Sequence, residues 1–211
     1  MQLLTLQPSP NNIKVRAALG YLEIPYQELP QRPDDRSAMV AATNQPCTPV
    51  LVDNGAGIFD SASILRHLHS VTPDSTLFPQ DTDNMRKLEA WEAGARFGVK
   101  DSVGAIFAMV FGRQEANAEN IAAAGEALVR DTASLEKVLS KRPYLMGEQP
   151  NAADFTWAGV LTYHIGLDTP NLRNTPFFEF MSKSFTLSEE QRPAVRAWAR
   201  RVLKFDTWIE G

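Results

Sequence analysis

The sequence has few of the residues that build metal centres or disulfides. Cys47 is the only cysteine in 211 residues, and the three histidines, His67, His69 and His164, are scattered along the chain. A single cysteine forms no internal disulfide, and two histidines spaced like His67 and His69 point away from each other on a helix. The sequence therefore predicts a protein without a structural metal.

An excess of basic residues and long apolar runs are also lacking. The chain has 21 Lys and Arg against 25 Asp and Glu, a formal charge of −4 that gives no basic footprint for nucleic acid. No stretch approaches the roughly 20 apolar residues that span a bilayer, and no basic segment with a following apolar run marks a signal peptide. We therefore expect a cytoplasmic protein with neither nucleic-acid nor membrane partners.

The first segment with a defined pattern is an apolar strand over residues 3–6, followed by a turn and a helix. Prolines bracket Ser9 in this turn, and either Asn11 or Asn12 is expected to cap the helix, because an Asn side chain accepts a first-turn N–H. Ser9 would then lie at a helix N-terminus, which favours an anion such as a thiolate. Taken alone, Ser9 is more typical of an ordinary turn residue.

Strands and helices alternate up to residue 71. We expect a turn into a short strand at 24–29, a short or irregular helix at 32–42, hairpin strands at 50–52 and 58–59, and a helix from Asp60 onward. This order, an alternating unit followed by a hairpin, is that of a thioredoxin-like domain.

The remainder of the chain is helical in character. Helices are expected over 85–111, 117–140, 151–165, 176–185 and 193–202. We therefore predict an α/β thioredoxin-like N-terminal domain (1–76), a linker (77–84), and an all-α helical C-terminal domain (85–211).

Two short motifs have both a structural and a functional interpretation. Pro49 precedes a strand, and were the Thr48–Pro49 bond cis, the Thr48 backbone would be free to pair with an extended peptide, although base rates favour trans. Asp60 and Ser61 open a helix, where a hydroxyl and free N–H groups suit a carboxylate and Asp60 suits an ammonium group. Taken alone, Asp60 and Ser61 are more typical of an ordinary helix cap.

Other notable residues are expected to be structural. Cys47 should be a packed, inert thiol, since free cysteines are usually buried. Asn151 and Asp154 form a variant of the capping box, which fixes where a helix begins. The aromatic stripe of the 85–111 segment should be mostly core, with a few members lining a cleft that faces the first domain; it comprises Trp91, Phe97, Phe107 and Phe111.

In their order and spacing, four segments together resemble the cytosolic glutathione transferase family over nearly the whole chain. They are Ser9-Pro10 with Lys14-Val15-Arg16, Thr48-Pro49-Val50-Leu51, Asp60-Ser61-Ala62-Ser63-Ile64 and Asn151-Ala152-Ala153-Asp154-Phe155. The resemblance implies a homodimeric detoxification enzyme that conjugates glutathione to a small hydrophobic electrophile, without a metal.

The same resemblance implies roles for individual residues. Ser9 would hydrogen-bond the glutathione sulfur, Thr48 before a cis Pro49 would pair with the cysteinyl portion, and Asp60 and Ser61 would hold the γ-glutamyl ammonium and carboxylate. The turn at Ser9 also resembles that of the Nu class, in which the Asn, here Asn11, contacts the sulfur and the enzymes resemble disulfide reductases.

One position departs from the family pattern. Cys47 stands where many relatives carry a Lys or Gln that holds the glycyl carboxylate of glutathione. Gln45, Arg32 or Arg36 would have to replace that contact. A third interpretation, a binding protein that keeps the fold without catalysis, is therefore also open.

Overall fold

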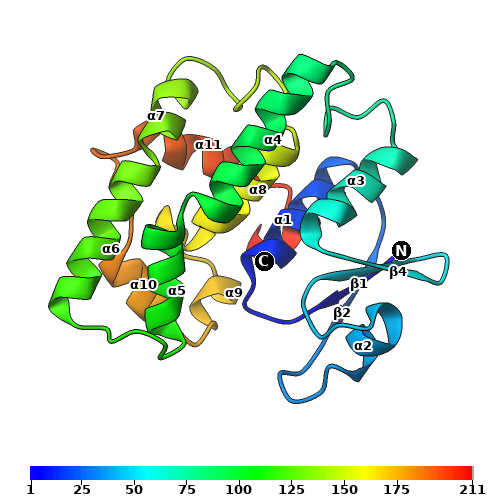
Figure 1. Cartoon of the computed structure of the whole chain (residues 1–211), viewed down its shortest axis with the longest axis horizontal. Coiled ribbons are helices and arrows are strands. Elements are labelled where there is room, and N and C mark those ends of the chain that lie inside the picture. The colour runs from blue at the N-terminus through cyan, green and yellow to red at the C-terminus, as the bar shows by residue number, and fades with distance from the viewer. Residues whose placement is uncertain (211) are drawn as a thin grey trace.

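The structure is a computed structural model, which describes residues 1–210 and places a four-stranded sheet beside a helical region (Figure 1). The strands are β1 (Gln2–Thr5), β2 (Gln27–Pro30), β3 (Val50–Asp53) and β4 (Ala56–Phe59). Their order in the sheet is β2-β1-β3-β4; β1 pairs in parallel with β2, and the other two pairs are antiparallel.

Three helices cover the two faces of this sheet. They are α1 (Pro10–Tyr21), α2 (Ser37–Thr43) and α3 (Ser61–Val71). Because neighbouring strand residues point to opposite faces, Leu3 and Leu51 join the main core with α1 and α3, whereas Leu4 and Val50 pack with Met39 of α2 in a smaller core. The predicted thioredoxin-like architecture is confirmed.

The rest of the described chain is helical, as predicted. It contains α4 (Thr82–Phe97), a single π-helical turn (Lys100–Gly104), α5 (Ala105–Val110), α6 (Ala118–Asp131), α7 (Ala133–Leu139), α8 (Ala152–Leu161), a 3-10 turn (Thr162–His164), α9 (Pro170–Arg173), α10 (Phe178–Ser184), α11 (Pro193–Leu203) and α12 (Thr207–Glu210). Within residues 1–210, no helix has the length and apolar character needed to cross a bilayer.

The two longest predicted helices are both interrupted, so these predictions were wrong. The 85–111 segment stops at Gly98, a poor helix former whose N–H ends α4 on the Gly94 carbonyl, and resumes after the π-helical turn. The 117–140 segment divides at Thr132, which ends α6 and precedes α7 and whose hydroxyl donates to the Leu128 carbonyl at 2.8 Å. The interruption after α4 opens space beside the sheet domain.

Helix α8 is the apolar centre of the helical region and packs directly on α1 (Figure 1). Its N-terminus carries the predicted capping box: Asn151 accepts from the Ala153 N–H at 2.9 Å, and Asp154 accepts from the Asn151 N–H at 3.0 Å. At Gly159 the two helices approach so closely that a Cβ atom would lie 2.7 Å from the Pro10 carbonyl oxygen. The start of α1 is thus held against α8.

The end of the chain returns to α1 and fixes its other flank. The buried Arg16 guanidinium donates to both carboxylate oxygens of Asp206 at 2.9 and 3.1 Å and to Glu28 at 3.2 Å. It also stacks 4.6 Å from the ring centroid of Trp208. Helix α1 is therefore anchored to β2 and to the C-terminal segment, which keeps its N-terminal turn in place.

Candidate functional site

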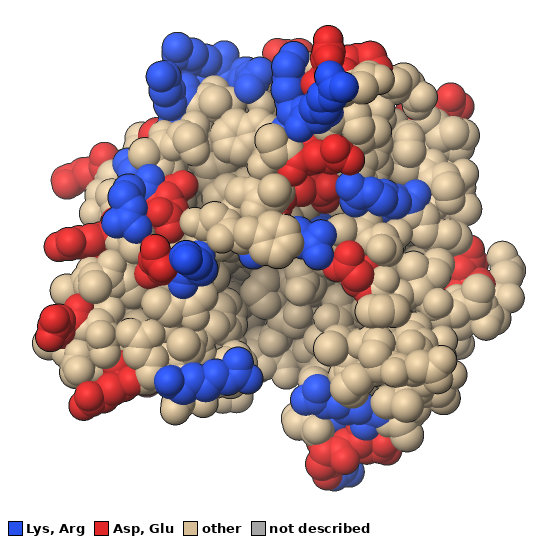
Figure 2. Space-filling view, viewed as in Figure 1, with Lys and Arg blue, Asp and Glu red and all other residues tan. Residues whose placement is uncertain are grey.

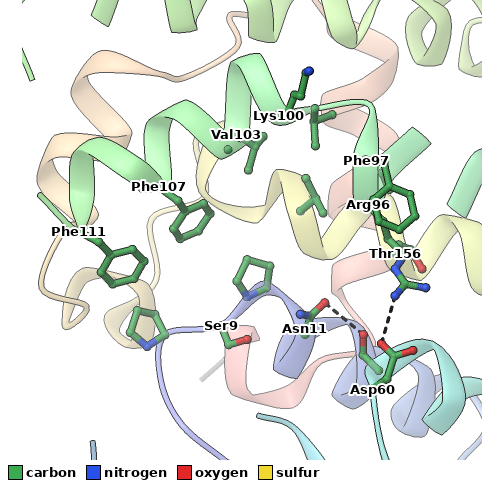
Figure 3. A pocket seen from close by; sticks show the side chains of 17 residues that line it. Ser9, Asn11, Asp60, Arg96, Phe97, Lys100, Val103, Phe107, Phe111 and Thr156 are labelled. Atoms are coloured by element: carbon green, nitrogen blue, oxygen red, sulfur yellow. Dashed lines mark hydrogen bonds and ion pairs between the residues drawn. The ribbon is translucent and has the colours of Figure 1, made fainter. Parts of the chain in front are cut away.

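A cleft of about 580 Å³ lies where the starts of α1 and α3 face α4, the π-helical turn and α5. Figure 2 shows the molecule hollowed near its middle, with side chains of both charges at the rim. Polar residues from the sheet domain line one wall, opposite aromatic residues of the helical region (Figure 3). Within residues 1–210, no three His, Cys, Asp or Glu side chains are placed to hold a metal ion.

Ser9, rather than Asn11 or Asn12, is the N-cap residue of α1, so the predicted cap was wrong. Its backbone is extended, and its carbonyl accepts the first helical N–H, from Asn12, at 3.0 Å. Ser9 is only 8% exposed, yet its hydroxyl has no hydrogen-bond partner among the residues that the structure describes. A partly enclosed donor at the N-terminus of a 12-residue helix is suited to an anionic ligand.

Asn12 does not cap the helix because its side chain forms hydrogen bonds with two other segments of the chain. Its amide nitrogen donates to the Leu6 carbonyl at 3.0 Å, and its oxygen accepts from the Thr48 hydroxyl at 2.7 Å. The same hydroxyl accepts from the Leu6 N–H at 3.0 Å. Thr48 and Asn12 therefore tie the end of β1, the start of α1 and the turn before β3 to one another.

The Thr48–Pro49 bond is cis, as the resemblance implies, and so is Gln7–Pro8, which no sequence signal singled out. In the described part of the chain, the Thr48 N–H and C=O have no backbone partner. Neither Thr48 nor Pro49 lines the cleft itself. Thr48 is joined to the residues of the cleft through its bond to Asn12.

Asp60 and Ser61 lie in the cleft wall beside Asn11. Asp60 is the N-cap residue of α3, with a φ of 63°, but its side chain makes no capping hydrogen bond, so it is not an ordinary cap. Its carboxylate instead lies 3.5 Å from the Arg96 guanidinium of α4 (Figure 3). The Ser61 hydroxyl donates to the Asn11 side-chain oxygen at 3.2 Å. A left-handed backbone at a non-glycine residue costs free energy and is concentrated at functional sites.

Arg96 and a buried charge cluster next to it were not predicted from the sequence. Lys14 of α1 lies 4.0 Å from Glu92, and Glu92 lies 3.2 Å from Arg66 and accepts from the Thr156 hydroxyl at 3.4 Å. Burial lowers the pKa of Lys14 to about 8, against the opposing attraction of Glu92 and Asp60. The i, i+4 pair of charges at 92 and 96, on a helix expected to face the first domain, was the available signal.

The opposite wall of the cleft is aromatic. Phe107 and Phe111 stack with centroids 6.0 Å apart, and Phe177 meets both rings edge-on at 6.1 and 6.2 Å. Phe97 is 69% and Phe111 56% exposed, so the expectation that the aromatic stripe is mostly core was wrong. The expectation that members of the stripe line a cleft is confirmed for Phe97, Phe107 and Phe111. Clustered exposed aromatic side chains mark a surface for an apolar ligand.

Cys47 is exposed, which contradicts the expected packed thiol. The side chains expected to replace a glycyl-carboxylate ligand near it are occupied within their own loop. Gln45 accepts from the Cys47 N–H at 2.6 Å and donates to the Thr43 hydroxyl at 2.8 Å. Arg32 pairs with Asp34 at 2.7 Å, and Arg36 donates to the carbonyl of Pro46 at 3.3 Å.

Two family profiles match the chain. The one described as glutathione S-transferase, N-terminal domain, matches residues 3–76, and the one described as glutathione S-transferase, C-terminal domain, matches residues 118–201. The probable glutathione S-transferase GSTU6 of Oryza sativa subsp. japonica is 23% identical over 215 residues, which cover 98% of this chain and 85% of that protein.

Solved structures of glutathione S-transferases show the same fold. The tau-class glutathione S-transferase of mango, Mangifera indica, superposes with a TM-score of 0.74 at 21% identity over 95% of this chain and 87% of that one. A glutathione transferase family member from Pseudomonas fluorescens, solved with two glutathione molecules bound, gives a TM-score of 0.73 at 20% identity over 97% and 91%. This chain belongs to the glutathione S-transferase family.

Proposed function

We propose that this protein is a glutathione transferase that conjugates glutathione to a hydrophobic electrophile. One observation carries the proposal: the free Ser9 hydroxyl, the Asp60–Ser61 pair and the aromatic wall line a single cleft. The first two suit the thiol and the γ-glutamyl end of glutathione, and the third suits an apolar second substrate. Thr48, before its cis Pro49, would pair with the cysteinyl backbone.

The proposed mechanism begins with the thiol. A hydrogen bond from Ser9, together with the positive end of the α1 dipole, favours the thiolate and so lowers the pKa of the bound thiol. The thiolate attacks the electrophilic carbon, a sulfur–carbon bond forms, and the leaving group departs with the bonding electron pair. The aromatic wall holds the electrophile beside the sulfur and contributes through orientation.

A second candidate, glutathione-dependent disulfide reduction, is favoured by the position of Asn11. The oxygen of its side chain accepts from Ser61, which leaves the amide nitrogen to donate to a sulfur atom in the cleft. In this reaction the thiolate attacks one sulfur of a disulfide, the original sulfur–sulfur bond breaks as a mixed disulfide forms, and the other sulfur leaves as a thiolate. We further propose a cytoplasmic homodimer with a detoxification role, on the basis of family membership alone.

The deciding experiment combines binding and turnover. Thermal melts with and without millimolar glutathione and its S-alkyl conjugate should show stabilisation in the wild type, because a ligand that binds only the native state raises apparent stability. The Asp60→Ala, Ser61→Ala double variant should lose that shift. Turnover of an aryl halide against hydroxyethyl disulfide then separates the transferase from the reductase. No shift in the wild type would favour a non-catalytic binding protein.

A further inference from the structure

The two ends of a γ-glutamyl thiol such as glutathione would meet different side chains: charged ligands at the amino-acid end and, among the residues that the structure describes, no free charged ligand at the other end. At the amino-acid end, Asp60 from the sheet domain and Arg96 from α4 lie 3.5 Å apart across the cleft, next to the Ser61 hydroxyl. Both charged side chains are accessible, 40% for Asp60 and 43% for Arg96. Figure 3 shows Arg96 reaching across from the helical side to Asp60.

This pair is complementary to a group that carries an ammonium and a carboxylate on one carbon. In the structure Asp60 and Arg96 satisfy each other, and the arriving ligand can replace that single contact with two: its ammonium on Asp60 and its carboxylate on Arg96 and Ser61. Guanidinium groups bind carboxylates in a planar, bidentate arrangement. Arg96 is supported for this role, because its guanidinium also lies 5.4 Å from the ring centroid of Phe97.

The segment around Cys47, where the glycine of glutathione would lie, presents no comparable ligand. Gln45 is bonded to the Cys47 N–H and carbonyl and to Thr43, and Arg32 is paired with Asp34. Arg36 is directed to the carbonyls of Pro33 and Pro46 in the same loop. No cation of this loop is among the residues that line the cleft.

We propose that the cleft recognises its thiol substrate by the zwitterionic amino-acid end of the γ-glutamyl group, whose α-carboxylate binds to Arg96. The cleft then accepts any γ-glutamylcysteine thiol, whatever follows the cysteine. This inference rests on the proposed function and adds to it a binding residue from the second domain. It also defines the class of thiol substrate more broadly than glutathione alone.

The experiment measures the dissociation constants of four thiols by calorimetry. Glutathione and γ-glutamylcysteine should agree within about threefold, and cysteinylglycine, which lacks the γ-glutamyl group, should show no saturable binding. The Arg96→Met variant should bind both γ-glutamyl thiols about tenfold more weakly, as expected for one charge-assisted hydrogen-bonded contact. The glutathione analogue without the γ-glutamyl α-carboxylate should bind the wild type and Arg96→Met equally.

Matched variants separate a specific effect from a general one. Arg86→Met removes an exposed arginine of the same helix that lies outside the cleft, and it should bind all thiols like the wild type. Arg96→Lys keeps the charge without the bidentate geometry and should fall between the wild type and Arg96→Met.

Three different results would contradict the role of Arg96, the tolerance of the glycine end, or glutathione binding itself. Equal glutathione affinity in the wild type and Arg96→Met would exclude Arg96 as the carboxylate ligand. A γ-glutamylcysteine affinity more than about 30-fold below that of glutathione, which corresponds to about 2 kcal/mol, would show that the protein also binds the glycine of glutathione. Absence of any glutathione binding to the wild type would overturn the proposed function itself, and the inference with it.

Discussion

Two kinds of helix N-terminus meet at the boundary between the sheet domain and the helical region. Helix α8 begins with a complete capping box, in which every oxygen of Asn151 and Asp154 side chains accepts a hydrogen bond. Helices α1 and α3 begin at Ser9 and Asp60, whose side chains cap nothing. All three starts have residues that ordinarily cap helices, yet only one of them uses these residues as caps.

The difference separates structural polar groups from those available to a ligand. Asp154 is fully buried and accepts from the Leu145 and Asn151 N–H groups and from the Trp198 indole. Ser9 and Asp60 keep their polar atoms directed toward an accessible cleft. A capping residue that is not used as a cap is therefore a better indicator of function than the presence of a capping residue.

The largest expected effect is at the capped terminus. Asp154→Ala should lower the free energy of unfolding by about 4 kcal/mol, because three buried donors lose their acceptor together. Asn151→Ala, which removes one capping bond, should cost only about 1 kcal/mol. Chemical denaturation of both variants checks the comparison, and equal losses would show that Asp154 does no more than an ordinary cap.

Ser9→Ala should behave in the opposite way. The conjugation rate should fall about 50-fold through loss of the donor to the thiolate, more than glutathione affinity falls. The free energy of unfolding should stay within about 0.5 kcal/mol of the wild type, since the hydroxyl caps nothing. Steady-state kinetics and denaturation are to be compared with Ser63→Ala, an exposed serine in the first turn of α3. Unchanged kinetics would turn attention to Asn11.

A pH series tests the buried charge between the two kinds of terminus. Because the pKa of Lys14 is lowered to about 8 in the folded protein, the unfolded chain binds more protons between pH 8 and 10.5, and stability from this group rises with pH. The free energy of unfolding of the wild type relative to Lys14→Met should therefore grow by about 2 kcal/mol from pH 7 to 10. Lys87→Met, at an exposed lysine, should show no such trend, and a flat difference for Lys14→Met would contradict the lowered pKa.

A smaller effect than that of Asp154→Ala is expected for the contacts that hold the start of α1. Thr48→Val keeps the shape of the side chain but removes the hydroxyl that joins the Leu6 N–H to Asn12. We expect a loss of about 1.5 kcal/mol in the free energy of unfolding, where Thr82→Val on the surface of α4 should lose almost none. A loss no larger than that of Thr82→Val would mean that other contacts hold this turn.

Sequence reasoning predicted the fold well because the signals were local. The alternation of strands and helices up to residue 71 and the capping box at Asn151 and Asp154 each depend on residues close together in the chain, and both are confirmed. The interruptions at Gly98 and Thr132 were missed because apolar spacing continued through both positions, and this spacing outweighed the local signals of a glycine and a back-bonding threonine.

Several residues of the cleft could be predicted from the sequence, but the side chains that they contact could not. Ser9, Asn11, Asp60 and Ser61 were singled out and do line one cleft. Arg96 was missed because its partner, Asp60, lies 36 positions away in another domain, and no sequence spacing records a contact of that kind. The exposure of Cys47 was missed because typical cysteine burial says nothing about a particular loop.

Because Gly159 has no side chain, α8 can lie close to the start of α1, so the position of Ser9 in the first domain depends on a residue of the second. A methyl group there would press on the Pro10 carbonyl, one residue from Ser9, and on the Lys14 side chain. A methyl group in the centre of the helical region would thus displace the turn that carries Ser9, although it would lie outside the cleft. For this reason, a helical region taken from a relative could replace this one only if it also had a glycine opposite Pro10.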